Sequence, residues 1–189
     1  MVTSLTMVRA EIDRRAMALL SSGHLATDFA NGALPALLPF LKERFSLSYT
    51  AVGGVVLASQ ASSSLIQPLF GLWSDRRGAM WLLPAGVALA GVGIALAADA
   101  PSYWLVLLLV LVSGVGVAAF HPEGSKFAAY ASGRKRASGM AWFSIGGNLG
   151  YALGPVATTA LVAWLDLKGG LLIAVPCVAV AAAIVAGTR

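Results

Sequence analysis

The residues whose types and spacing suit proton chemistry lie inside long apolar stretches. His24, Asp28 and Asn31 stand at positions i, i+4 and i+7, which places them on one face of a helix. A charge at the centre of a bilayer costs from about 3 to more than 10 kcal/mol, so such residues mark functional sites or are paired. We predict that Asp28 carries a proton and that His24 relays it or orients the carboxylate. The alternative is a pair that only holds helices together.

A second candidate pair, His121 and Glu123, flanks a proline. Pro122 disfavours helix at the residue before it and removes one N–H, which frees carbonyls beside two titratable groups. Interrupted helices with polar side chains often line transport paths, so both residues are candidates for proton coupling. The alternative is that Glu123 pairs with Lys126 at i+3 near the membrane surface, which is worth only about 0.2–0.5 kcal/mol. The sequence leaves the depth of both residues open.

Uncharged polar residues supply candidates for a substrate cavity. Gln60 and Gln67 share one face of an apolar segment, and Asn148 lies in another, so that with Asn31 they could line a cavity. Hydrogen bonds between helices are the alternative, worth about 0.6 kcal/mol each on average.

The sequence shows none of the common signatures of an enzyme. It has no metal-ligand spacing, no nucleophile with an orienting base and no glycine loop for a phosphate. We therefore expect no catalytic residue, no metal and no cofactor. The basic residues lack the interleaved aromatics that stack bases, so nucleic acid is not an expected partner.

The composition indicates a membrane protein. Of the 189 residues, 58% are hydrophobic and 11% are charged, whereas soluble domains carry about 25% charged residues. A bilayer core needs about 20 mostly apolar residues per helix. Six segments qualify, at 17–41, 50–73, 79–98, 102–130, 138–163 and 169–187. We predict a cytoplasmic N-terminal segment at 1–16 and a six-helix transmembrane bundle at 17–189.

The distribution of lysine and arginine predicts the orientation, because cytoplasmic loops carry an excess of positive charge. Three basic residues fall on one side of the predicted bundle: Lys42, Arg44 and Lys168. The other ten fall on the opposite side: Arg9, Arg14, Arg15, Arg76, Arg77, Lys126, Arg134, Lys135, Arg136 and Arg189. Both termini are therefore expected in the cytoplasm.

A faint internal repeat suggests how the helices are related. The segments Trp73–Gly78 and Trp164–Gly169 share Trp, Asp, a basic residue and Gly at the same relative places. Three helices per copy would give two copies of opposite orientation, so the expected fold is all-α with two inverted three-helix repeats. The alternative is that loops simply favour glycine and charge.

Two motifs resemble those of the major facilitator superfamily. The segment Gly71–Gly78, with Gly71, Asp75, Arg76 and Gly78 at the motif positions, is similar to the signature loop after its second helix. Gly150, Gly154 and Pro155, preceded by Gly146, resemble its antiporter motif in helix five. The chain departs from the family at 156–159, which lack a glycine pair, and at 105–112, which lack the arginine expected in helix four. The role of that arginine is not carried over.

Further segments resemble the fosmidomycin-resistance branch of that superfamily. They are Phe120–Lys126, Ala131–Gly133, His24 with Asp28, Gln67–Asp75 and Gly146–Gly150. The resemblance implies a bacterial inner-membrane antiporter of twelve helices that drives efflux of a small drug or polar metabolite with protons. This chain would be the N-terminal half, working in the lipid bilayer as a homodimer or with a second half. The alternatives are a non-transporting fragment or assembly module, and a passive channel.

Overall fold

The computed structural model describes residues 11–187, and within them every regular element is a helix. The elements are α1 Arg14–Arg44, α2 Tyr49–Arg77, α3 Leu82–Ala98, α4 Tyr103–Ala131, α5 Arg136–Leu165, the 3₁₀ helix η1 Asp166–Ile173 and α6 Ala174–Gly187. Arg9 and Arg189, two of the basic residues used for the orientation, lie outside the described residues.

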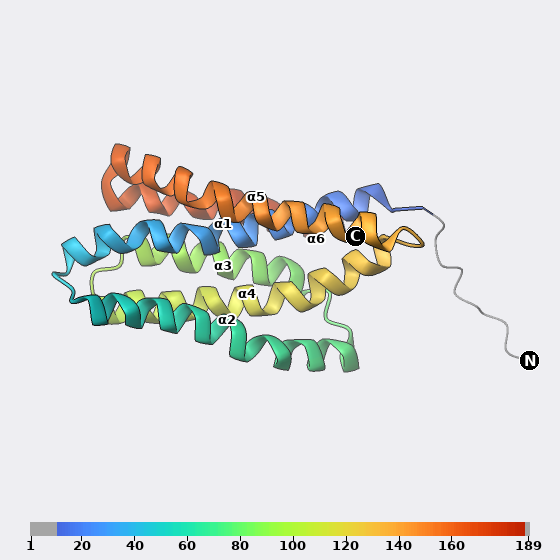
Figure 1. The fold of residues 1–189 in the computed structure, drawn as a ribbon, viewed down its shortest axis with the longest axis horizontal. Helices are drawn as coiled ribbons and strands as arrows, with labels where there is room; N and C mark the ends of the chain where they lie inside the picture. Colours follow the sequence, from blue (N-terminus) through green and yellow to red (C-terminus); the bar gives the residue numbers. More distant parts are fainter. Residues whose placement is uncertain (1–10, 188–189) are drawn as a thin grey trace, which may run out of the picture.

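The helices form an elongated bundle in which α1, α3 and α4 occupy the middle (Figure 1). α5 packs along α1, α2 and α3 pack along α4, and α6 packs against α3 and α1. The helices alternate in direction, so the start of α1 and the ends of α2, α4 and α6 lie at the same end of the bundle (Figure 1). We call this end the N-terminal end.

Short polar side chains define where several helices begin. Asp13 accepts a hydrogen bond from the backbone N–H of Ala16 at 3.1 Å, and Ser48 accepts one from Ala51 at 3.1 Å. These bonds satisfy backbone donors that a helix start leaves unpaired. Gly78, with φ of +60°, then ends α2, because a residue without Cβ adopts this conformation without strain.

Two helix boundaries differ by four residues or more from the sequence-based prediction. α2 continues to Arg77, so most of the predicted signature loop is the last turns of a helix. The last predicted helix, 169–187, begins its α-helical part only at Ala174, because the preceding residues form η1. Gly169 and Gly170 are poor α-helix formers, and a Cβ at Gly169 would collide with the Leu161 carbonyl, so η1 folds closely against α5.

Three helical stretches within residues 11–187 are long and apolar enough to cross a membrane. They are Tyr49–Arg76, Tyr103–Ala131 and Arg136–Gly187, and the last of these contains α5, η1 and α6. α3 is a shorter apolar helix. Six membrane crossings and the inverted repeat therefore remain predictions.

The glycine stripe of α5 brings that helix into backbone contact with α1. A Cβ added at any of the three glycines would collide with a carbonyl oxygen of α1. These collisions pair Gly146 with Ser21, Gly150 with Leu25 and Gly154 with Phe29. In these pairs the residue number on α1 rises with the residue number on α5, so the two helices run in the same direction. At the glycines their backbones are in direct contact. This close approach positions the side chains of α1 described next.

Candidate functional site

His24 and Asp28 of α1 meet His121 of α4 in one compact cluster. His24 Nε2 lies 3.2 Å from Asp28 Oδ2, and His121 Nε2 lies 3.3 Å from Asp28 Oδ1. The carboxylate therefore lies between two imidazoles, one from α1 and one from α4. We call His24, Asp28 and His121 the histidine–aspartate cluster.

Backbone carbonyls hold both imidazole rings in place. His24 Nδ1 lies 2.8 Å from the Phe143 carbonyl oxygen, and His121 Nδ1 lies 2.9 Å from the Val117 carbonyl oxygen. A carbonyl can only accept a hydrogen bond, so each Nδ1 carries the hydrogen and donates it. The His24 ring also stacks on the Phe143 ring with centroids 4.1 Å apart. Each Nε2 is thereby turned towards Asp28.

This arrangement fixes how many protons the cluster can share. With both Nδ1 atoms protonated, a neutral histidine has only a lone pair at Nε2, and an ionised carboxylate has only lone pairs as well. Neither contact with Asp28 is then a hydrogen bond unless a proton is added. One added proton satisfies one contact, and two satisfy both. The geometry therefore suits a site that holds one or two protons.

The cluster lies near the middle of α1 and is only partly covered. Asp28 is 14 residues from the start of this 31-residue helix, which is about 21 Å along a length of about 46 Å. The exposed side-chain fractions are 13% for His24, 16% for Asp28 and 23% for His121. The structure thus places His121 at the level of α1 where Asp28 lies, a depth that the sequence left open.

Gly147 of α5 makes room for the cluster. A Cβ at this position would lie 2.5 Å from His24 Nε2 and 2.7 Å from Asp28 Oδ2. Real Cβ contacts are essentially never this short, so any side chain here would displace the two residues. Gly147 is therefore part of the site.

Glu123 does not join His121 in this cluster, although only Pro122 separates them. Its fully buried side chain pairs with Lys126 at 2.8 Å between Nζ and Oε2. Ser74, near the end of α2, donates a hydrogen bond to Glu123 Oε2 and accepts one from Lys126. The i+3 pairing considered from the sequence is thus present, but it is buried and ties α2 to α4. We call these three residues the Ser74–Glu123–Lys126 cluster.

We expect Glu123→Gln to lower the stability of the protein substantially. Removing one partner of a buried ion pair leaves the other charge uncompensated, which typically costs about 3–5 kcal/mol. Because Lys126 is 23% exposed, we expect the loss of stability to be at or below the lower end of that range. The measurement is the thermal unfolding midpoint of the purified protein in detergent.

Asp75→Asn is the matched control for that substitution. Asp75 also lies near Lys126, but at 3.7 Å and with 69% of its side chain exposed, so its pairing is worth about 0–1 kcal/mol. Equal destabilisation by both substitutions would contradict the role assigned to Glu123.

The residues of the signature motif lie mostly inside α2. Gly71, Asp75 and Arg76 are helical, and only Gly78 follows the helix. A Cβ at Gly71 would lie 3.7 Å from Pro122 Cβ, which is an ordinary contact, so packing does not require glycine there. The motif contacts α4 chiefly through Ser74, which is not one of the four motif positions.

The four cavity candidates are not gathered at the histidine–aspartate cluster. Gln60 on α2 and Asn148 on α5 are exposed, whereas Asn31 and Gln67 are half-buried. Among residues 11–187, no hydrogen bond or ion pair joins any of the four to the cluster. Pro155 lies within α5 without ending it.

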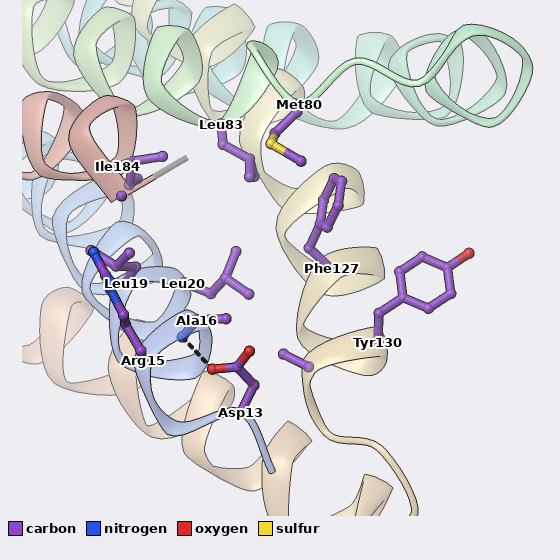
Figure 2. A pocket seen from close by; sticks show the side chains of 12 residues that line it. Asp13, Arg15, Ala16, Leu19, Leu20, Met80, Leu83, Phe127, Tyr130 and Ile184 are labelled. Carbon is purple, nitrogen blue, oxygen red and sulfur yellow. Dashed lines mark hydrogen bonds between the residues drawn. The ribbon is translucent and has the colours of Figure 1, made fainter. Parts of the chain in front are cut away.

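A cavity of about 380 Å³ lies at the N-terminal end of the bundle, away from the cluster. Figure 2 shows that Leu19 and Leu20 of α1, Leu83 of α3 and Phe127 of α4 give it a largely apolar lining. None of the three cluster residues lines it.

Several residues of the site could not be found from the sequence. Phe143 and Val117 contribute carbonyl oxygens, which leave no trace in residue type. Gly147 lies between the glycines of the helix-five motif, but its contact with the cluster depends on how α5 packs against α1. The spacing His24–Asp28 was visible, whereas the partner His121 is 93 positions further along the chain.

The family model of the Major Facilitator Superfamily matches residues 20–188. The chain is 37% identical over 144 residues to the fosmidomycin resistance protein of Escherichia coli, which covers 76% of this chain and 36% of that protein. It is 35% identical over 139 residues to an uncharacterised MFS-type transporter, YfnC, of Bacillus subtilis. That match covers 74% of this chain and 34% of YfnC. The chain thus spans about a third of the length of these relatives.

A third relative is named for the compound that it transports. The chain is 35% identical over 137 residues to the riboflavin transporter RibZ of Clostridioides difficile, which covers 69% of this chain and 30% of that protein. No solved structure matches the chain. The relatives are transporters rather than enzymes, which confirms the expectation that the chain is not an enzyme. The resemblance to the fosmidomycin-resistance branch is likewise confirmed.

Proposed function

This chain belongs to the major facilitator superfamily, and from that premise we propose that it is half of a proton-coupled exporter. The histidine–aspartate cluster is its coupling site, with Asp28 as the proton carrier and His24 and His121 as its partners. The observation that carries the proposal is the position of Asp28 between two imidazoles near mid-helix.

The protonation of the cluster supplies the coupling. Its two contacts become hydrogen bonds only when protons are present, and the His121–Asp28 contact joins α4 to α1, so loading and unloading that contact change how firmly the two helices are tied. A carboxylate that opens to one side of the membrane and then to the other can thereby move protons against substrate. Glu123, paired with Lys126, is assigned to holding α2 against α4 rather than to carrying protons.

A second six-helix unit completes the transport path. In this superfamily two halves face each other about an axis along the membrane normal, with the substrate between them. A second copy of this chain could supply the other wall, because a cyclic dimer places identical surfaces face to face. α2 and α5, the flanking helices, carry the exposed apolar side chains Leu65, Leu69, Leu149 and Leu153, which are available for such a partner or for lipid.

The charges at the two ends of the bundle support the proposed orientation. Arg14, Arg15, Arg76, Lys126, Arg134, Lys135 and Arg136 lie at the N-terminal end. Lys42, Arg44 and Lys168 lie at the opposite end. We place the N-terminal end in the cytoplasm and the bundle in the bacterial inner membrane.

The names of the relatives supply candidate substrates. A fosmidomycin resistance protein and a riboflavin transporter are both similar to this chain, so fosmidomycin and riboflavin are the first two compounds to test. Asn31, Gln60, Gln67 and Asn148 remain candidate contacts for a polar substrate.

The test is transport by the purified chain in proteoliposomes, combined with its oligomeric mass in lipid nanodiscs. We expect a discrete dimer and substrate flux that depends on an imposed proton gradient. Flux without any gradient would identify a passive channel instead. A monomer that moves neither compound, but does so once a second six-helix half is added, would reject the homodimer and retain the half-transporter. No transport in either case would leave an assembly module.

A further inference from the structure

We propose that the histidine–aspartate cluster also binds a divalent first-row transition-metal cation, for which Zn²⁺ is the probe. The ligands are His24 Nε2, His121 Nε2 and one carboxylate oxygen of Asp28. Two imidazoles with one carboxylate, leaving further positions open, is a donor set that such cations take in proteins. The spacing of residues along the sequence gave no sign of this site, because its third ligand comes from another helix.

The distances between the donor atoms fit one shared cation. Zinc bonds of about 2.0–2.2 Å in a tetrahedral site place neighbouring ligand atoms about 3.3 Å apart. The observed separations are 3.2 Å from His24 Nε2 to Asp28 Oδ2 and 3.3 Å from His121 Nε2 to Asp28 Oδ1, so each imidazole faces a different oxygen of the same carboxylate. One ligand atom from each residue lies within 4.8 Å of the other two, so no pair of donor atoms needs to approach by more than roughly 1.5 Å to share one cation.

The backbone already orients the ligands as a metal site requires. A metal-bound histidine usually donates its second ring N–H to a carbonyl or carboxylate, which fixes the tautomer and aims the free nitrogen at the cation. His24 and His121 both have this arrangement, through the carbonyls of Phe143 and Val117. The orientation of the two rings therefore supports the metal site independently of the distances between the donor atoms.

The surroundings leave room for a cation and for an exchangeable fourth ligand. The three side chains are 13–23% exposed, so a cation can reach them and water can complete its coordination. Lys126, the cation on the nearest turns of α4, is neutralised by its own partner Glu123. The three ligand side chains are therefore partly open to solvent, and the nearby Lys126 is held by its own partner.

The proposal extends beyond proton coupling and does not depend on it. A cation held by α1 and α4 would bridge the same two helices that the protons bridge. We therefore expect bound Zn²⁺ to compete with the proton-coupled state, but its binding can be measured without any transport.

The experiment is isothermal titration of Zn²⁺ into the full chain, purified with a tag that contains no histidine. We expect one Zn²⁺ per chain, with affinity reduced more than roughly 100-fold in each of His24→Gln, Asp28→Asn and His121→Gln. The controls are Cys177→Ala, which removes the single thiol, and Asp99→Asn, which removes a carboxylate paired with Arg44 at the other end of the bundle. Both are expected to bind Zn²⁺ like the unaltered chain.

A spectroscopic measurement on the unaltered chain tests the metal site even if a variant folds poorly. Co²⁺ bound to the unaltered chain should show the visible bands of a low-coordinate nitrogen and oxygen site. Absence of saturable binding, or binding unchanged by Asp28→Asn, would overturn the metal site. Loss of Zn²⁺ binding with proton-coupled transport retained in Asp28→Asn would instead overturn the proposed function and leave the metal site standing.

Discussion

Replacing Asp28 by asparagine should abolish gradient-driven transport while leaving the protein folded in the membrane. Asparagine keeps the shape of the side chain, and its amide N–H can donate to the Nε2 lone pair of one histidine, but it cannot bind or release a proton. We therefore expect substrate flux under a proton gradient to fall to the level of protein-free vesicles. Binding of substrate, measured at equilibrium without a gradient, should persist. The two measurements together separate coupling from folding.

Asp99→Asn is the matched control for that substitution. Asp99 also makes an ion pair, at 3.3 Å with Arg44, but this pair lies at the opposite end of α1 and α3 and is about one third exposed. We expect transport close to that of the unaltered chain. Retained proton coupling in Asp28→Asn, or equal losses in the two variants, would refute the assignment of Asp28.

The general architecture could be predicted because it follows from local patterns. Low charge and long apolar runs select a membrane protein, and the positions of the helices followed from those runs to within a few residues for α1 to α5. The prediction was wrong where glycine and close packing override hydropathy, as at Gly169 and Gly170 before α6. Hydropathy also could not show that α2 continues through the signature motif, because helix propensity extends the helix after the apolar run has ended.

The candidate site could be predicted only in part. The spacing of His24 and Asp28 on one helix was visible, because i and i+4 residues share a face. The contact between Asp28 and His121 depends on how α1 and α4 pack. So does the fact that Glu123 does not join His121 in the cluster. Adjacent positions on α4 point about 100° apart, so two residues separated by one position face different neighbours. Here one faces α1 and the other faces α2.

The same packing explains why one sequence segment serves two purposes. His121 and Glu123 flank Pro122, which does not end α4 in the structure. The proline removes one backbone donor while the helix continues, so both side chains stay at fixed angles to the two neighbouring helices. His121, which contacts α1, is therefore only two residues from Glu123, which belongs to the Ser74–Glu123–Lys126 cluster and contacts α2.

Replacing Gly147 by alanine should uncouple transport without removing any group that binds a proton. The added Cβ would lie 2.5 Å from His24 Nε2 and 2.7 Å from Asp28 Oδ2, so the two side chains must move apart from it. Overpacking of this kind costs about 1–3 kcal/mol. We expect gradient-driven flux to fall severely, together with Zn²⁺ affinity, because both need the cluster geometry.

Two further alanine substitutions isolate that effect. A Cβ at Gly150, also on α5, would have backbone atoms of Leu25 and Phe29 as its three nearest neighbours, so Gly150→Ala should lower the unfolding midpoint while weakening Zn²⁺ binding less. A Cβ at Gly53 on α2 meets nothing within 4 Å, so Gly53→Ala should be neutral or, by about 1 kcal/mol, stabilising. If Gly147→Ala lost no more Zn²⁺ affinity than Gly150→Ala, the site would not depend on the space that Gly147 leaves. The cluster geometry would then be supported by α1 and α4 alone, and α5 would serve only to pack against them.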